Sequence, residues 1–161
     1  MADIKFDEAV NVCLQTRQLD FKLKDLQLSV LKDVIVHNKD VLAVLPTGYG
    51  KTIIYSLILT IVDNYIDVSN TIVIVISPLV ALMEDQVVNI EETGIRCVYA
   101  SKTQSQETRR ELESGSVPVI LMSPESLFHQ ETEWRQLFST EIYQSRVAAI
   151  AVDEAHCVEQ W

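Results

Sequence analysis

The sequence predicts an α/β fold, a mainly parallel β-sheet with helices on both faces. Short apolar runs rich in β-branched residues alternate with amphipathic helical patterns along its 161 residues. A glycine-containing turn at residues 45–52 joins one such run to a helix, and an acidic pair, Asp153 and Glu154, follows the last run. Because parallel strands end at one edge of their sheet, ligands are expected there.

Length and composition indicate one folded domain. Hydrophobic residues make up 48% and charged residues 22% of the chain, and its net charge is −10. Phosphate contacts come from Lys and Arg, so any nucleic-acid contact must be local to a few residues. Three widely spaced cysteines indicate a reducing, intracellular compartment. No secretory signal is visible, and the apolar runs are too short for a membrane span.

The first part of the chain is expected to be helical. Apolar residues recur at helical spacing in residues 6–19 and 23–36, which predicts two amphipathic helices. Residues 40–45 are apolar and predict a buried strand, and residues 53–62 predict a helix without a breaker. We therefore divide the chain into N-terminal helices at residues 1–36 and a sheet domain at residues 37–161.

Four further buried strands are expected at residues 71–76, 96–100, 117–122 and 147–152. The segments between them have helical patterns. Ser77 is placed to cap a helix that runs to residue 90, and Gly94 closes it. Ser123 opens a short helix, a polar helix covers residues 105–113, and the segment from residue 130 to residue 145 predicts one surface helix.

The turn at residues 45–52 has the chemistry of a phosphate cradle. Gly48 and Gly50 let backbone N–H groups approach a polyphosphate, Lys51 supplies a positive charge, and Thr52 offers a hydroxyl to Mg²⁺. The strict pattern G-x-x-x-x-G-K-[ST] has glycine where this chain has Leu45. Taken alone, the segment is therefore also compatible with an ordinary turn from a strand to a helix.

A second motif, Asp153-Glu154-Ala155-His156, follows the last predicted strand. Asp153 is placed to reach the Mg²⁺ held by Thr52, and Glu154 to orient or deprotonate an attacking water. An acidic pair after a strand can also be a solvated loop, and a single histidine can be structural. The two motifs together predict a nucleoside triphosphate site.

Three segments in this order resemble the motifs of superfamily 2 helicases, and most of all those of the RecQ family. They are the cradle at residues 45–52, the run Ser-Pro-Leu-x-x-Leu-Met-x-Asp-Gln-Val at residues 77–87, and Asp-Glu-Ala-His-Cys-x-x-Gln-Trp at residues 153–161. The resemblance covers nearly the whole chain. It implies the first RecA-like lobe of an ATP-driven, 3′-to-5′ DNA-unwinding motor, acting in DNA repair and recombination and located in the nucleus.

The resemblance also assigns the catalytic and metal-binding residues. Lys51 would bind phosphate, Thr52 and Asp153 would hold Mg²⁺, Glu154 would activate water, and His156 would couple nucleotide state to DNA. The other cradle residues that would contact ATP are Thr47, Gly48, Tyr49 and Gly50.

Adenine recognition is implied for residues 21–27, where an aromatic and a basic residue precede a glutamine. Gln27 is the residue that would read the base. The family more usually places the glutamine about three residues after the basic one, and Lys22 lies further away. A surface position on a helix is the alternative for Gln27.

The resemblance implies that Ser77, Pro78 and Gln86 contact the DNA backbone, and the DNA-contacting set also includes Ser123 and Trp161. Hydroxyl groups and the N–H groups at a helix start can make such contacts. Ser123 is equally explained as a helix cap. The DNA would be a junction of single strand and duplex, bound by the complete motor.

Further parts of the motor are expected beyond Trp161, including the rest of the first lobe and a second lobe with arginine fingers. An arginine finger is worth roughly 10³ to 10⁵ in rate, so these residues alone are not expected to unwind DNA. One alternative is another superfamily 2 enzyme, such as an RNA helicase, against which Cys157, Gln160 and Trp161 argue. A second alternative is an inactive nucleotide-binding module that acts through partners.

Overall fold

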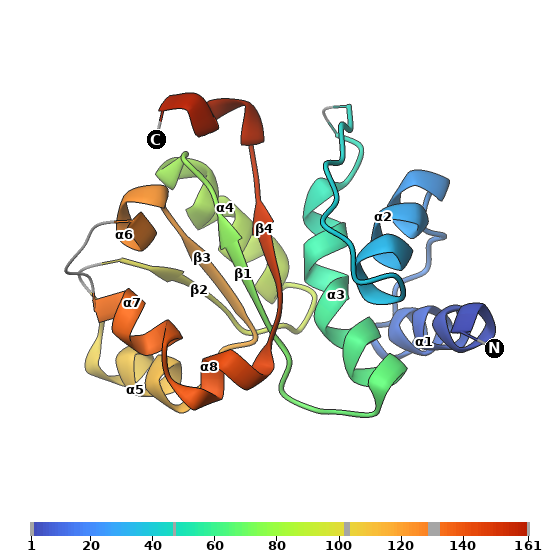
Figure 1. Cartoon of the computed structure of the whole chain (residues 1–161), viewed down its shortest axis with the longest axis horizontal. Helices are drawn as coiled ribbons and strands as arrows, with labels where there is room; N and C mark the ends of the chain where they lie inside the picture. Colours follow the sequence, from blue (N-terminus) through green and yellow to red (C-terminus); the bar gives the residue numbers. More distant parts are fainter. Residues whose placement is uncertain (1, 47, 102–103, 129–132, 161) are drawn as a thin grey trace. The chain divides into compact units, whose positions relative to one another are not determined.

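The computed structural model describes residues 2–46, 48–101, 104–128 and 133–160. These residues form two compact units, Met1–Thr71 and Ile72–Trp161. In Figure 1 the first unit runs from blue to green and the second from green to red. The described part of the first unit is helical with connecting coil, and the second contains the β-sheet.

The first unit consists of α1 (Ala2–Thr16), α2 (Asp25–Ile35) and α3 (Lys51–Ile66), with α1 and α2 both packed on α3. The two predicted amphipathic helices and the third, apolar helix are confirmed. The apolar stripe of α1 buries four residues, whereas α3 is mostly apolar and buries seven side chains between Ile54 and Ile61. Arg17, after the end of α1, donates hydrogen bonds to Thr60 of α3.

The strand predicted at residues 40–45 is wrong. The structure has coil there, with Leu42 and Val44 exposed to 82% and 86%. An extended apolar segment becomes a strand only when a neighbouring strand pairs with its N–H and C=O groups. Within the described residues of the first unit there is no such strand, because the rest is helix and coil.

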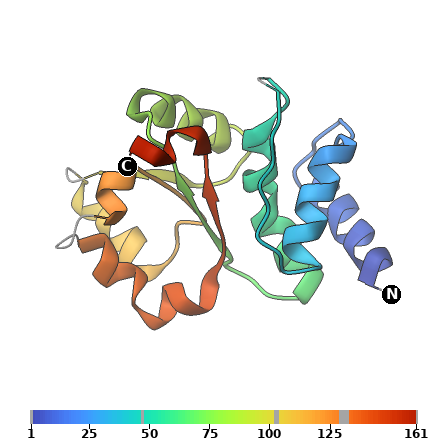
Figure 2. The same ribbon diagram turned by 45° about the horizontal axis from the view of Figure 1, so that its top comes forward.

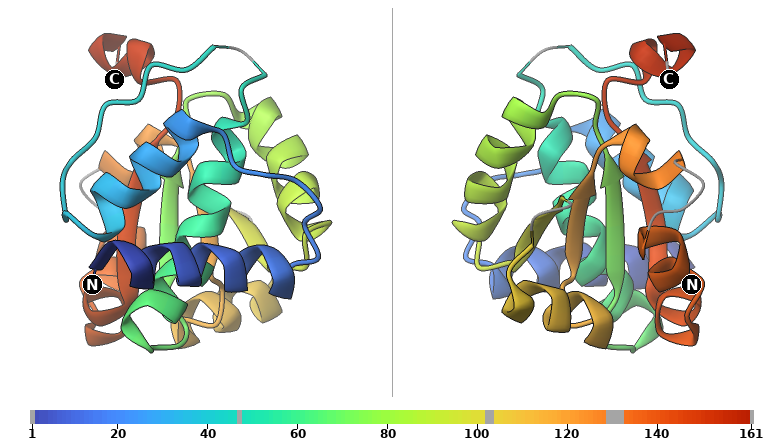
Figure 3. Two further views of the ribbon diagram at one scale, coloured as in Figure 1. Left: turned by 90° about the vertical axis from the view of Figure 1, so that its right-hand side faces the viewer. Right: turned by 90° about the vertical axis from the view of Figure 1, so that its left-hand side faces the viewer.

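The second unit is built on a four-stranded parallel sheet with the order β2-β3-β1-β4. The four later strand predictions are confirmed within two residues at each end. The strands lie side by side in Figure 3, and their bounds are β1 (Ile72–Ile76), β2 (Cys97–Ala100), β3 (Val119–Met122) and β4 (Val147–Val152).

Helices cover both faces of this sheet, as predicted (Figure 3). On one face α4 (Val80–Glu91) packs against β2 and β3. On the other, side chains of α5 (Gln106–Ser114), α7 (Glu133–Phe138) and α8 (Glu141–Arg146) join the strands in one core. Buried Tyr143 of α8 donates to the Leu112 carbonyl at 2.6 Å, and burial raises its pKa to about 12, so it stays a neutral donor.

Three details differ from the sequence predictions. The single helix expected between residues 130 and 145 is two helices, α7 and α8. The break falls at Ser139 and Thr140, whose hydroxyls bond to the carbonyls of Arg135 and Leu137 and compete with helix continuation. Residues 130–132 lie outside the described residues.

Strand β4 is only half buried: its residues alternate between partly buried and exposed, and Ile150 and Val152 are 60% and 43% exposed. Ser77 does not cap α4: the N-cap is Leu79, which makes no side-chain cap bond.

Two short helices complete the unit, α6 (Pro124–Phe128) after β3 and the 3₁₀ helix η1 (Ala155–Gln160) after β4, the latter visible in Figure 2. Of the helices described, none has the length and apolar character that crossing a membrane requires.

Candidate functional site

The turn before α3 has the backbone of a phosphate cradle. Tyr49 N donates to the Pro46 carbonyl at 3.1 Å, and Gly50 is the N-cap of α3 with φ +90°. Gly48 also has a positive φ, +75°. Glycine adopts such values without the steric cost that a Cβ brings. The two glycines thus leave the backbone free to approach a ligand, and their contact with phosphate stays a prediction. Thr47 lies outside the described residues.

Lys51 and Thr52 form the first turn of α3, a helix of 16 residues, and both are partly exposed. The N-terminus of a helix carries unpaired N–H groups and a partial positive charge, both of which favour a phosphate. The Thr52 hydroxyl accepts a hydrogen bond from Tyr55 at 3.2 Å. Thr52 is the second residue of α3, so its hydroxyl lies in the first turn of the helix, beside Lys51 in the sequence.

Gln27 is buried beneath this turn and is only 2% exposed. Its Nε2 donates to the carbonyls of Tyr49 and Gly50 at 3.0 and 3.2 Å, and its Oε1 accepts from Lys24 N at 2.9 Å. The alternative of a surface glutamine on a helix is therefore wrong. Gln27 connects α2 to the phosphate turn, although its predicted role as reader of adenine stays a prediction.

Lys24 is a basic residue beside the turn to which the sequence analysis gave no role. Its Nζ lies 4.2 Å from the ring centroid of Tyr49 and 3.3 Å from the Tyr49 carbonyl oxygen. Such a cation–π contact stabilises the ring position. Lys24 stands three residues before Gln27, which is the family spacing, so that spacing was the signal that could have identified Lys24 in place of Lys22.

We expect Gly50→Ala to weaken ATP binding by about tenfold, the equivalent of one or two lost hydrogen bonds. An added Cβ would lie 2.8 Å from Gln27 Nε2, and the φ of +90° would be strained. Isothermal titration of ATP into the complete protein measures the affinity.

Gly48→Ala is the matched control for this substitution. At Gly48 φ is +75°, but an added Cβ would have nothing within 4 Å. The backbone cost is therefore similar while Gln27 stays undisturbed, and a smaller loss is expected. Equal losses in the two variants would show that the Gln27 contact does not matter.

The acidic pair follows β4 in the second unit. Asp153 N donates to the Ile76 carbonyl at 2.8 Å, which continues the pairing of β4 with β1 by one residue. Glu154 has a left-handed backbone, φ +50°, and its Oε2 lies 3.2 Å from His156 Nδ1. Asp153 and Glu154 are partly buried and His156 is exposed. The predicted catalytic residues of this unit are thus adjacent at the carboxyl end of its sheet.

Asp153 is held on both carboxylate oxygens. Oδ1 accepts from Glu154 N at 3.0 Å, and Oδ2 accepts from Gln86 Nε2 of α4 at 3.1 Å. The amide oxygen of Gln86, Oε1, is buried and has no hydrogen-bond partner among the described residues. Sequence reasoning assigned Gln86 to the DNA backbone and did not foresee this contact.

The remaining residues predicted to contact DNA have varied surroundings. Ser77 is fully buried, and its hydroxyl has no partner within the described part of the chain. Pro78 is partly exposed. The Ser123 hydroxyl accepts from Ser126 N at 3.3 Å, which confirms its place as a cap of α6. Trp161 lies outside the described residues.

Asp153 and Gln86 of the second unit carry oxygen atoms that suit a hydrated Mg²⁺. Mg²⁺ is usually bound by one or two carboxylates, phosphate oxygens and water, and not by a cage of protein ligands. Asp153 supplies a carboxylate, and the orphaned Gln86 Oε1 beside it is an acceptor suited to a metal-bound water. Among the described residues no cluster of three or more His, Cys, Asp or Glu could hold a metal by itself.

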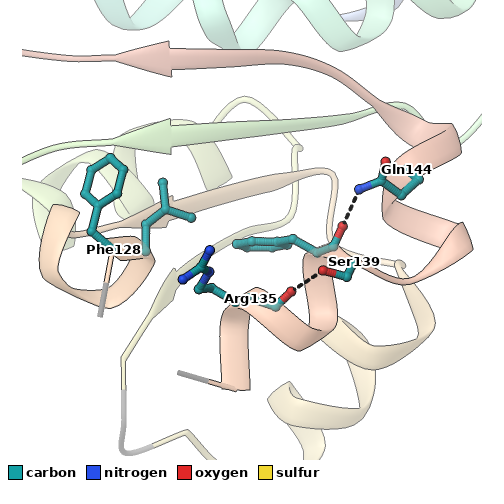
Figure 4. Close-up of a pocket in the computed structure, with 6 residues that line it drawn as sticks. Phe128, Arg135, Ser139 and Gln144 are labelled. Carbon is teal, nitrogen blue, oxygen red and sulfur yellow. Dashed lines mark hydrogen bonds between the residues drawn. The ribbon is translucent and has the colours of Figure 1, made fainter. Parts of the chain in front are cut away.

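A hollow of about 340 Å³ lies elsewhere in the second unit, between α6, α7 and α8. Figure 4 shows Phe128, Arg135, Ser139 and Gln144 around it. Gln144 donates to the Phe138 carbonyl at 3.0 Å, and Ser139 to the Arg135 carbonyl at 2.7 Å. None of the predicted site residues is among the side chains that line it. Its polar groups serve to end α7.

The sequence of this chain is similar to the sequences of known helicases. The family profile described as DEAD/DEAH box helicase matches residues 24–161. The mouse (Mus musculus) bifunctional 3′-5′ exonuclease/ATP-dependent helicase WRN is 33% identical over 150 residues, 92% of this chain and 10% of that protein. The ATP-dependent DNA helicase RecQ of Haemophilus influenzae is 33% identical over 130 residues, 78% of this chain and 19% of that protein.

A third relative, the ATP-dependent DNA helicase RecQ of Bacillus subtilis, is 32% identical over 144 residues, 87% of this chain and 22% of that protein. The chain therefore spans between about a tenth and a fifth of the length of these curated relatives. The predicted resemblance to RecQ-family helicases is confirmed.

Proposed function

This chain belongs to the DEAD/DEAH box helicase family, and from that premise we propose that it is the ATP-binding part of a RecQ-type 3′-to-5′ DNA helicase. The observation that carries the proposal is the phosphate turn at the start of α3, which Gln27 holds from below by its hydrogen bonds to Tyr49 and Gly50. In this assignment residues 37–161 belong to the first RecA-like lobe, and residues 1–36 bring the adenine-recognising segment.

ATP would be bound through its phosphates at the cradle. The N–H groups of the turn and of the first turn of α3 would donate hydrogen bonds to the phosphate oxygens, and Lys51 would neutralise the phosphate charge. Thr52 and Asp153 would hold Mg²⁺, which supplies charge stabilisation to the transferred phosphoryl group when bound. Gln27 keeps the turn in place in this structure. To read the adenine, as proposed, its amide would exchange its bonds to the turn for bonds to the base.

Glu154 is the proposed base for the attacking water. A carboxylate within hydrogen-bond reach of water can orient it and accept its proton. His156, 3.2 Å from Glu154, can exchange that contact for others and so link the acidic pair to bound DNA.

DNA contact is proposed for Ser77 and Pro78 before α4 and for Gln86 within it. Ser123 and Trp161 complete this set, and the DNA would be a single strand or a junction with duplex. The net charge of −10 means that this contact is local to a few residues of the chain. We also propose an intracellular, nuclear location, in keeping with the DNA substrate. The rival substrate is RNA, as in other members of the family.

ATP hydrolysis by the complete protein is expected to rise on adding single-stranded DNA and to stay at its basal level with RNA of the same sequence. A coupled phosphate-release assay measures both. Unwinding is then tested on duplexes with a 3′ or a 5′ single-stranded tail, and only the 3′-tailed duplex is expected to be separated. Stimulation by RNA alone would assign the chain to an RNA helicase, and ATP binding without hydrolysis would assign it to a non-catalytic module.

A further inference from the structure

Gln86 connects two parts of the second unit: α4, which follows the segment expected to contact DNA, and the acidic pair after β4. It lies on α4, whose start follows the segment expected to contact DNA, and its amide Nε2 is 3.1 Å from Asp153 Oδ2 at the end of β4. The two residues are 67 positions apart in the chain, so this hydrogen bond is a tertiary contact and not a local turn.

The environment of this contact makes it stronger than a surface hydrogen bond. The bond is partly buried, and an amide donor to a carboxylate is roughly twice as strong as a neutral pair. The second carboxylate oxygen is fixed by Glu154 N. With both oxygens held, the Asp153 carboxylate has one orientation.

The other end of the Gln86 amide is unusual because Oε1 is buried without a partner in the described part of the chain. Leaving a buried acceptor unpaired costs about 1–3 kcal/mol, so such an atom points to a group that completes it. A carboxamide whose nitrogen binds Asp153 has its oxygen close to the same carboxylate. A water molecule on a cation at Asp153 is a donor of the right chemistry and in the right neighbourhood.

We propose that Gln86 is a positioning residue for the Mg²⁺ carboxylate: it fixes Asp153 through Nε2 and accepts a hydrogen bond from a metal-bound water through Oε1. It acts on the ion through Asp153 and water, and it is not itself a ligand. Residues that orient metal ligands in this way change metal affinity or activity by about 10- to 100-fold when they are replaced. The inference rests on the proposed function, since it concerns the metal that accompanies ATP.

The test is the dependence of ATP hydrolysis on divalent metal in the complete protein, with Mn²⁺ binding followed by electron paramagnetic resonance as a readout independent of turnover. Gln86→Met keeps the length and the helix preference of the side chain and removes both hydrogen bonds. It is expected to weaken Mn²⁺ binding in the presence of ATP about tenfold or more. Binding of ATP in EDTA is expected to be unchanged.

Asn89→Leu is the matched control, because Asn89 is an exposed amide one turn further along α4. It is expected to leave Mn²⁺ binding at the wild-type value. Circular dichroism confirms that each variant is folded. If Gln86→Met does not fold, Gln86→Glu replaces it: this change keeps the shape, removes the donor to Asp153 and is expected to weaken Mn²⁺ binding as well.

Wild-type Mn²⁺ affinity in a folded Gln86→Met protein would overturn the proposal. Tighter Mn²⁺ binding by Gln86→Glu would overturn it too, because position 86 would then lie within direct reach of the ion. If the unaltered protein itself shows no metal-dependent ATP binding, the proposed function fails. If the unaltered protein binds ATP in a metal-dependent way and Gln86→Met binds Mn²⁺ with the same affinity, only the role of Gln86 is contradicted.

Discussion

Replacing Glu154 by Gln is expected to lower DNA-stimulated ATP hydrolysis by about 10²- to 10⁴-fold, the usual contribution of a general base. Glutamine keeps the length of the side chain and can still accept a hydrogen bond from His156, but it cannot take up a proton from water. The affinity for ATP is expected to stay close to that of the unaltered protein. Steady-state kcat and a calorimetric titration of ATP measure the two quantities separately.

Glu113→Gln is the control for this change, because Glu113 is an exposed residue of α5 and the substitution is chemically the same. It is expected to hydrolyse ATP at the rate of the unaltered protein. A Glu154→Gln variant with a rate within a factor of about two of the control would mean that another group activates the water, since a base contributes far more than that.

Lys51→Ala is expected to affect binding as well as turnover. Removing a charged partner of the phosphates costs about 1.5–3 kcal/mol, which corresponds to roughly 10- to 100-fold weaker ATP binding. Hydrolysis at saturating ATP is also expected to fall, because the same charge stabilises the transferred phosphoryl group. Calorimetry and a hydrolysis assay over a range of ATP concentrations measure both losses.

Lys39→Ala is the lysine control. Lys39 lies 3.1 Å from Asp33 in an exposed ion pair, a type of contact that contributes about 0–1 kcal/mol and lies outside the phosphate turn. Its ATP affinity is expected to match the unaltered protein. Unchanged ATP binding by Lys51→Ala would remove the turn at residues 45–52 from the proposed site, whatever the outcome for Glu154.

The sequence predicted the helices and strands whose pattern of apolar residues matches the side chains that are buried in the structure. Residues 71–76 are apolar on both faces, and the strand that they predict lies inside the sheet between β3 and β4. Residues 40–45 have a similar composition and are coil. The difference is a pairing partner far along the chain, which composition does not encode.

The site was predictable where a residue type has one chemical use and not where its use depends on a tertiary neighbour. The glycines of the turn and the acidic pair were identified from their types and their order. The spacing of Lys24 from Gln27 was a signal in the sequence. The Asp153 contact of Gln86 left no such signal, because it depends on which side chain another element brings within about 3 Å. Ser77 shows the same limit, since its hydroxyl was expected at a helix cap and is buried instead.

The left-handed backbone at Glu154 sets fold stability against catalysis at a single residue. A side chain with a Cβ costs roughly 1–2 kcal/mol in this conformation, whereas glycine pays little and asparagine tolerates it better than most. Substitutions that relieve the backbone would therefore remove the carboxylate proposed as the base. Directed evolution for thermal stability alone would select against Glu154, so this local strain should persist only where the proposed base is needed.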